Sequence, residues 1–260
     1  MLLNKKYSKR LLLWSLFFVL VFSSIGQDSE TTYPFEPGEK LRYELVYNWG
    51  LIWAKAGYVD FGVNDTIVSG KKHLHFHGYG SSYSNWDWFY KVRSNYESFA
   101  SLDLKSERFI RLGTEGKHYY NRDYHVKGDT IYTTFKDKNG EANYTKLYSP
   151  EPALDVISAI YYCRTLDFNS YSVGEKIPLT FYLDGSIYPS YLRFLGSETW
   201  THPKNKTDHQ CWVFKPLLIE GTVFKEGENM TVYVSKDEKK IPLYIETDLA
   251  IGKAKVFLID

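Results

Sequence analysis

Residues 38–63 read GEKLRYELVYNWGLIWAKAGYVDFGV, and this stretch decides the fold class. In its first half the apolar residues Leu41, Tyr43 and Leu45 alternate with Arg42 and Glu44. A repeat of two residues places successive side chains on opposite faces, so the pattern predicts a β-strand with one buried face. Residues 56–63 predict a partner strand.

Further short strands with turn signals between them follow along the chain. Asn139-Gly140 and Asp184-Gly185 suit tight turns, because Asn, Asp and Gly tolerate a positive φ. Short strands at nearly regular spacing favour a meandering antiparallel sheet that curls or closes. The further strands are predicted at 72–79, 89–99, 108–112, 117–125, 130–135, 142–147, 176–183, 191–201, 210–219, 230–235, 243–248 and 253–259.

One segment breaks the β pattern. Residues 153–166 (ALDVISAIYYCRTL) follow two prolines and contain no internal glycine or proline, which predicts a helix. Asp155 can cap its start by accepting a backbone N–H of the first turn. Apolar side chains cover most of its circumference, so we expect it to be buried. The expected fold is mainly β: a strongly curved antiparallel sheet or β-barrel-like single domain with one buried helix at about residues 153–166.

The N-terminus has the order of a secretory signal peptide. Four basic residues between Lys5 and Arg10 precede an apolar run, and small residues follow up to Gly26. The run is shorter than the roughly 20 residues that span a bilayer, although an uncleaved anchor is the alternative. We expect a signal peptide at 1–26, a flexible lead-in at 27–37 and a single β-rich domain at 38–260. No cysteine lies near the cut, so the exported protein is not expected to be a lipoprotein.

Composition limits the partners. The whole chain has a net charge of +1, which gives it no electrostatic reason to seek nucleic acid. No later stretch approaches membrane-spanning length, so the mature chain is expected to be soluble and without a transmembrane segment.

The two cysteines permit at most one disulfide. Cys163 lies in the predicted helix and Cys211 in a predicted strand, each among apolar neighbours. Sequence does not bring them together, and buried free thiols are common, so free thiols are favoured.

Catalytic signatures are missing from the sequence. It has neither a phosphate-binding loop nor a Gly-x-Ser-x-Gly motif, and no pair of carboxylates can be chosen without distances. His73, His75 and His77 share one face of a predicted strand, but further metal ligands are not nearby. We therefore expect no catalytic residues, no metal site and no cofactor.

Aromatic clusters are the strongest candidates for ligand contact. Large aromatics near glycine-containing turns can line an apolar pocket or offer a platform to a sugar ring, although packing in the core is the alternative. Arg164 on the helix could meet an anion, or could only offset the helix dipole. The ligand-binding candidates are Trp49, Trp53, Trp86, Trp88, Tyr90, Tyr161 and Arg164.

Several segments resemble the domain-of-unknown-function family 3108. They are GEKLxY (38–43), WGLIWAKAG (49–57), DVISAIYYCR (155–164), FKPLL (214–218), TVYVSxD (231–237) and IPL (241–243). The resemblance spans roughly residues 35–260. It implies an exported bacterial protein, here in the periplasm of a Gram-negative cell, and it brings no established catalytic residues.

These observations favour a non-catalytic binding module for an apolar or amphiphilic ligand such as a lipid or glycolipid, held between the sheet and the helix. The alternative is a carbohydrate-binding or protein-interaction module of the cell envelope that uses exposed aromatics. An envelope hydrolase ranks last, and the oligomeric state stays open.

Overall fold

The structure is a computed structural model that describes residues 32–49, 52–218, 227–249 and 252–259, without the side chains of Trp49 and Ile52. The chain divides into two units, Met1–Thr32 and Tyr33–Asp260, and the sheet belongs to the second. The predicted signal peptide lies outside the described residues and stays a prediction.

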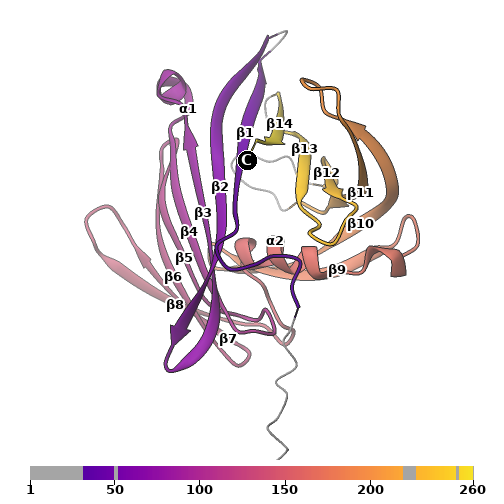
Figure 1. Ribbon diagram of the computed structural model, residues 1–260. Coiled ribbons are helices and arrows are strands. Elements are labelled where there is room, and N and C mark those ends of the chain that lie inside the picture. The colour runs from indigo at the N-terminus through magenta and orange to yellow at the C-terminus, as the bar shows by residue number, and fades with distance from the viewer. Residues whose placement is uncertain (1–31, 50–51, 219–226, 250–251, 260) are drawn as a thin grey trace, which may run out of the picture. The chain divides into compact units, whose positions relative to one another are not determined.

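Within the described residues, fourteen strands form one antiparallel sheet in the order β8-β7-β6-β5-β4-β3-β2-β1-β14-β13-β12-β11-β10-β9 (Figure 1). This confirms the mainly β, antiparallel class. The strands are β1 (Lys40–Trp49), β2 (Ile52–Val68), β3 (Lys71–Ser82), β4 (Val92–Ala100), β5 (Ser106–Glu115), β6 (His118–Lys127), β7 (Thr130–Lys136), β8 (Ala142–Tyr148), β9 (Lys176–Leu183), β10 (Ser186–Thr201), β11 (Asp208–Pro216), β12 (Met230–Ser235), β13 (Pro242–Asp248) and β14 (Lys253–Leu258).

The predicted helix is present as α2 (Val156–Thr165). Asp155 caps it as predicted, because its side chain accepts from the backbone N–H groups of Ile157 and Ser158. The other helical segments are short: α1 (Asp87–Tyr90) and the 3-10 turns η1 (Ser84–Trp86) and η2 (Phe168–Ser170). Among the described residues, no helix is both long enough and apolar enough to cross a membrane.

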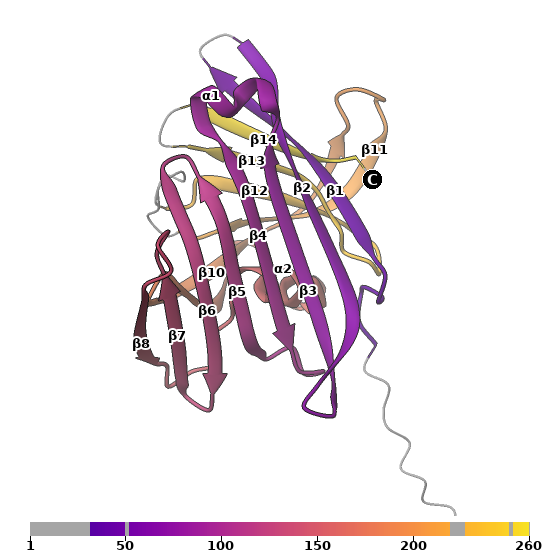
Figure 2. The ribbon, with the colours of Figure 1, turned by 90° about the vertical axis from the view of Figure 1, so that its left-hand side faces the viewer.

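Two apolar clusters lie on the inner face of the sheet, which we define as the face that carries Phe76 and Phe109. The first cluster joins β2–β7 to α2 through Ile157 and Tyr161. The second joins β9–β12 to η2 and to the end of α2, where Leu166 is buried. Figure 2 shows α2 behind β3 to β5, and the curvature of the sheet brings both clusters against this one helix. Burial of these apolar side chains supplies the main driving force for the fold.

The sheet rolls up without closing. Its two edge strands, β8 and β9, are not hydrogen-bonded to each other. Instead, β9 lies against the inner face of β5 and β6, where the Tyr182 ring is 6.2 Å from Phe109 and 5.4 Å from Tyr124. The next residue but one, Asp184, forms an ion pair with Arg111 at 2.7 Å. The edge strand β9 therefore packs against the inner face of the half of the sheet that contains β5 and β6.

A buried carboxylate fixes α2 to this sheet. Asp155 is fully buried, and its Oδ2 accepts from the hydroxyls of Ser98 at 2.7 Å, Ser106 at 2.6 Å and Ser158 at 2.9 Å. Ser106 also shares a hydrogen bond of 2.7 Å with the Tyr182 hydroxyl. One acid thus links α2, β4, β5 and β9, because a buried carboxylate needs several donors to offset its lost hydration.

Two expectations need adjustment. The strand predicted at 89–99 begins only at Val92, because residues 84–90 are helical; the Asp87 carboxylate there accepts from Ser82 at 2.6 Å and forms an ion pair with Arg93. The lead-in predicted at 27–37 contributes to the core near its end. The Phe35 ring is buried and packs edge-on against Phe76 and Tyr161.

Both cysteines are free thiols, as the sequence favoured. Burial raises the pKa of Cys163 to about 12 and that of Cys211 to about 11. Because the thiolate is the reactive form, we expect iodoacetamide at pH 8 to leave both thiols unmodified in the folded protein and to alkylate both in guanidinium chloride. Intact mass measures this, and rapid alkylation of the folded protein would contradict it.

Candidate functional site

Six inner-face residues stand opposite one another across neighbouring strands, and those in the middle are small. We call them the small-residue row: Tyr43, Val59, Gly80, Ser94, Gly113 and Tyr120. A Cβ atom added at Gly80 would have one described atom within 4 Å, Val92 Cγ1 at 4.0 Å. Two residues earlier, a Cβ atom at Gly78 would lie 2.9 Å from the Ile157 side chain of α2. Gly80 therefore lies just past the helix, where α2 does not cover it, whereas Tyr43, Ser94 and Tyr120 of the same row are buried.

Apolar side chains flank the row on one side. Leu45 on β1 stands opposite Val256 on β14, and both are half-buried. Val59 within the row is also half-buried, whereas Val63, on the same face of β2, is fully buried against the first cluster. Solvent thus reaches apolar side chains on the inner face, which is the property of a surface that can accept an apolar group.

A charged cluster flanks the row on the other side. The buried Arg111 forms ion pairs with Glu115 at 3.0 Å and Asp184 at 2.7 Å, and its guanidinium lies 3.5 Å from the centre of the Tyr120 ring. Glu115 also accepts hydrogen bonds from Ser94 at 2.8 Å and Tyr96 at 2.7 Å. Burial raises the pKa of Tyr96, so its hydroxyl stays a donor. The inner face is therefore apolar near the β1 end of the row and polar near the β5 end.

The segment that precedes β4 crosses one end of this face. Trp86 donates through Nε1 to the Lys55 carbonyl at 2.8 Å, and the Phe89 ring lies 6.4 Å from Tyr47 on β1. At Gly116, in the β5–β6 turn, an added Cβ atom would lie 2.5 Å from the Tyr90 ring. Residues 84–90 thus reach from β2 to β5 across the strand ends, and we call them the rim segment.

The structure separates the predicted ligand-binding residues into two groups. Trp86, Trp88 and Tyr90 all belong to the rim segment, and Trp88 is 72 % exposed. Trp53 lies near the same strand ends but shares the outer face with Lys255, whose Nζ is 4.6 Å from its ring centre. The side chain of Trp49 lies outside the described residues. Tyr161 and Arg164 lie on α2 and are not brought to the rim.

Arg164 is held by other parts of the chain. It is 2 % exposed and forms a bidentate ion pair with Glu39, with distances of 2.6 and 2.9 Å. It also donates to the backbone carbonyls of Pro34 and Lys239, each at 3.0 Å. The Tyr161 ring stacks on Phe76 at 4.2 Å. Both side chains therefore tie α2 to the sheet.

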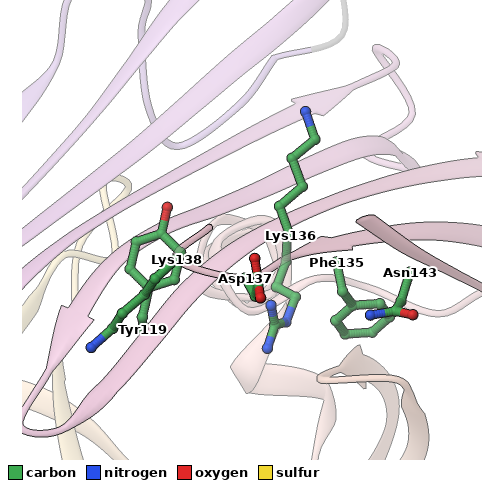
Figure 3. A pocket seen from close by; sticks show the side chains of 7 residues that line it. Tyr119, Phe135, Lys136, Asp137, Lys138 and Asn143 are labelled. Atoms are coloured by element: carbon green, nitrogen blue, oxygen red, sulfur yellow. The ribbon is translucent and has the colours of Figure 1, made fainter. Parts of the chain in front are cut away.

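A pocket of about 260 Å³ lies where the β6–β7 ladder ends, at the pair formed by Arg122 and Phe135. We call it the Arg122 pocket. Figure 3 shows its lining, which comes from β6, from the end of β7, from the β7–β8 turn and from the start of β8. The lining residues are Tyr119, Arg122, Phe135, Lys136, Asp137, Lys138 and Asn143.

Two of the three histidines on β3 contact carboxylates of other strands. His73 is buried and contacts Glu107 at 2.9 Å, and His75 contacts Glu97 at 3.4 Å. Within the described part of the chain, no group of three His, Cys, Asp or Glu residues is arranged to hold a metal ion.

Glu228, which lies just before β12, has a carboxyl pKa far below its ordinary value. Hydrogen bonds from Arg193 and Tyr191 lower the pKa of Glu228 to about 2. The ordinary value for glutamate is about 4.3, so this contact stabilises the fold above that pH and is lost as the pH falls towards 2. We expect the Glu228 carboxyl carbon to titrate near pH 2 by NMR and to return towards about 4.3 in Arg193→Gln. A midpoint near 4 in the native protein would contradict the contact.

Sequence reasoning missed Gly80, Ser94, Arg111 and Arg122. Alternation does contain a signal: Gly80 and Arg111 share a face with Phe76 and Phe109 of their own strands, and Ser94 and Arg122 share a face with the buried Ser98 and Tyr124 of theirs. Their assembly depends on strand registers and on the contact of β9 with β5, which no local pattern encodes.

Comparisons with known proteins agree with this fold. A family model described as "Protein of unknown function (DUF3108)" matches residues 42–259. Among solved structures, a beta-barrel-like protein of the domain of unknown function DUF1849 from Brucella abortus is similar, with a TM-score of 0.57 at 9 % identity over 85 % of this chain and 95 % of that one. At that identity the likeness concerns the fold alone. No curated protein matches the chain.

Proposed function

Since this chain belongs to the DUF3108 family, whose function is unknown, we propose a function from its own geometry: it is a non-catalytic protein that binds an amphiphilic ligand, such as a lipid or glycolipid, on the inner face of its sheet. The observation that carries this proposal is the small-residue row, where Gly80 leaves the inner face uncovered beside α2.

The two flanks of the row match the two ends of an amphiphile. Leu45, Val59 and Val256 offer half-buried apolar surface to a chain, which gains about 25 cal/mol for each Å² that it buries. Across the row, Arg111 and Glu115 offer charged groups to a polar head. Between them, Gly80 leaves room for the ligand to approach the backbone closely.

In this proposal the rim segment forms the entrance and α2 forms the floor. Trp86, Trp88 and Tyr90 lie where a ligand would enter, and we assign Trp49 and Trp53 to the same end of the sheet. Tyr161 and Arg164 act indirectly, because they hold α2 as the buried helix against which the ligand would end.

We also propose that the protein acts in the bacterial periplasm after removal of residues 1–26. The support is the order of basic, apolar and small residues in that segment. The mass of the protein recovered from a periplasmic fraction tests this directly, since a retained leader would overturn it.

The binding proposal is tested by native mass spectrometry of the protein purified from its own envelope without detergent. We expect one bound amphiphile, which organic extraction releases and identifies. A mass equal to that of the polypeptide alone, together with no uptake of added phospholipid or glycolipid, would overturn the proposal.

The exposure of the rim favours one other function. Trp88 is 72 % exposed and Phe89 46 % exposed, and exposed aromatic rings can stack on sugars. A carbohydrate-binding module would bind glycans on an array and would lose them in Trp88→Ala, while an amphiphile-binding protein would not bind the array.

A further inference from the structure

We propose that the Arg122 pocket binds a phosphoryl anion through the Arg122 guanidinium. The site lies outside the small-residue row, and it stands on its own contacts whether or not the amphiphile proposal holds. The chemical class is a phosphate group, either free or at the head of a lipid.

Arg122 differs from the other arginines in its partners. Among the residues that the structure describes, every arginine except Arg122 has a carboxylate within ion-pair distance. The Nε atom of Arg122 is buried and has no described hydrogen-bond partner, and its Nη1 makes only a long contact of 3.4 Å with the Asn121 carbonyl. A buried N–H group without an acceptor loses its hydration, and an anion that reaches it would restore the hydrogen bond.

The Phe135 ring lies beside this guanidinium. The Arg122 Cζ atom lies 4.5 Å from the Phe135 ring centre, within the range of a cation–π contact. A cation–π contact limits the movement of the guanidinium and uses none of its N–H groups. Arginine in this arrangement matches the oxygen spacing of a phosphate.

The remaining lining adds positive charge. Lys136 is the last residue of β7 and Lys138 lies in the β7–β8 turn, and within the described chain neither forms an ion pair. The acid between them, Asp137, is used by the turn itself, because its Oδ1 accepts from the backbone N–H groups of Asn139 and Glu141 at 2.9 Å each. Three cations against one acid favour an anion in the pocket.

Calorimetry at low ionic strength tests the site with two probes, inorganic phosphate and dihexanoyl phosphatidic acid below its micellar concentration. We expect the native protein to bind phosphate and Arg122→Gln to bind it about tenfold or more weakly. Lys127→Gln, which removes a charge from the other end of β6, is the matched control and should bind as the native protein does. Tighter binding of the lipid than of phosphate assigns the group to a lipid head, and equal binding assigns it to free phosphate.

Two results would overturn the proposal: no binding of either probe at millimolar concentration, or equal weakening by Arg122→Gln and Lys127→Gln. Circular dichroism checks that Arg122→Gln is folded. If it is not, the double variant of Lys136→Gln and Lys138→Gln replaces it, because both side chains are exposed and their loss spares the core. That variant should weaken phosphate binding about fivefold, and unchanged binding would overturn the proposal. Failure here leaves retention of an amphiphile on the inner face unaffected, so the two proposals are distinguished.

Discussion

Replacing Asp155 by alanine is expected to destabilise the protein by about 4 kcal/mol or more, which is a large part of the roughly 5–15 kcal/mol that stabilises a domain. The fully buried carboxylate accepts five hydrogen bonds, two from the start of α2 and three from serine hydroxyls. Loss of a helix cap costs about 1 kcal/mol, and each buried donor left without an acceptor costs about 1–3 kcal/mol. Urea denaturation measures the effect.

Two variants make this prediction specific. Asp155→Asn keeps one oxygen for the backbone N–H groups of Ile157 and Ser158 and should lie between the native protein and Asp155→Ala. Asp167→Ala removes an exposed cap, that of η2, which accepts from Asn169 N at 3.1 Å, and should cost about 1 kcal/mol or less. A loss below about 1 kcal/mol in Asp155→Ala would show that this acid does not hold the helix to the sheet.

Replacing Arg164 by methionine is expected to cost about 3–5 kcal/mol, because it leaves the mostly buried Glu39 carboxylate without its bidentate partner. The double variant of Arg164→Met and Glu39→Leu should recover part of this loss, since it removes the unpaired charge as well. Thermal or urea unfolding of both proteins measures the difference.

The matched control is the pair of Arg42 and Asp60, which has similar geometry on the exposed face of β1 and β2. Arg42→Met should cost no more than about 1 kcal/mol. Equal losses in Arg164→Met and Arg42→Met would contradict the assigned role of Arg164 in holding α2 against β1 and the β12–β13 turn.

Much of the fold could be predicted because its signals are local. The strands predicted at 176–183 and 230–235 coincide with β9 and β12, and Asp155 caps α2 as expected. Alternation, turn residues and capping all act within a few residues, so a single sequence contains them.

Local signals failed where a neighbouring strand decides the outcome. β10 begins at Ser186, five residues before its predicted start, and runs through Pro189. The proline is tolerated because it stands opposite Thr180 of β9, while pairing with β11 begins only at Leu192. The early helical turn at Asp87 likewise depends on contacts with Ser82 and Arg93 from the flanking strands.

The site could be predicted only in part. Clustering of aromatics found the rim segment, since Trp86, Trp88 and Tyr90 lie within five residues of the chain. It did not show that Tyr161 and Arg164 hold α2 in place, because their partners, Phe76 on β3 and Glu39 just before β1, are far away in the sequence. The charged flank was missed because Arg111 meets Asp184 only after the sheet rolls β9 onto β5.

The central claim is that the small-residue row on the inner face holds the ligand. Gly80→Leu tests it most directly, because a leucine there would fill the space that the glycine leaves beside Val92. Gly80→Ala is the matched control, since its Cβ atom fits at 4.0 Å from the nearest described atom.

Native mass spectrometry of the three proteins, purified alike from the envelope, gives the decisive comparison. We predict that the native protein and Gly80→Ala retain an amphiphile and that Gly80→Leu loses most of it while its melting temperature stays within a few degrees. Full retention by a folded Gly80→Leu would contradict the claim.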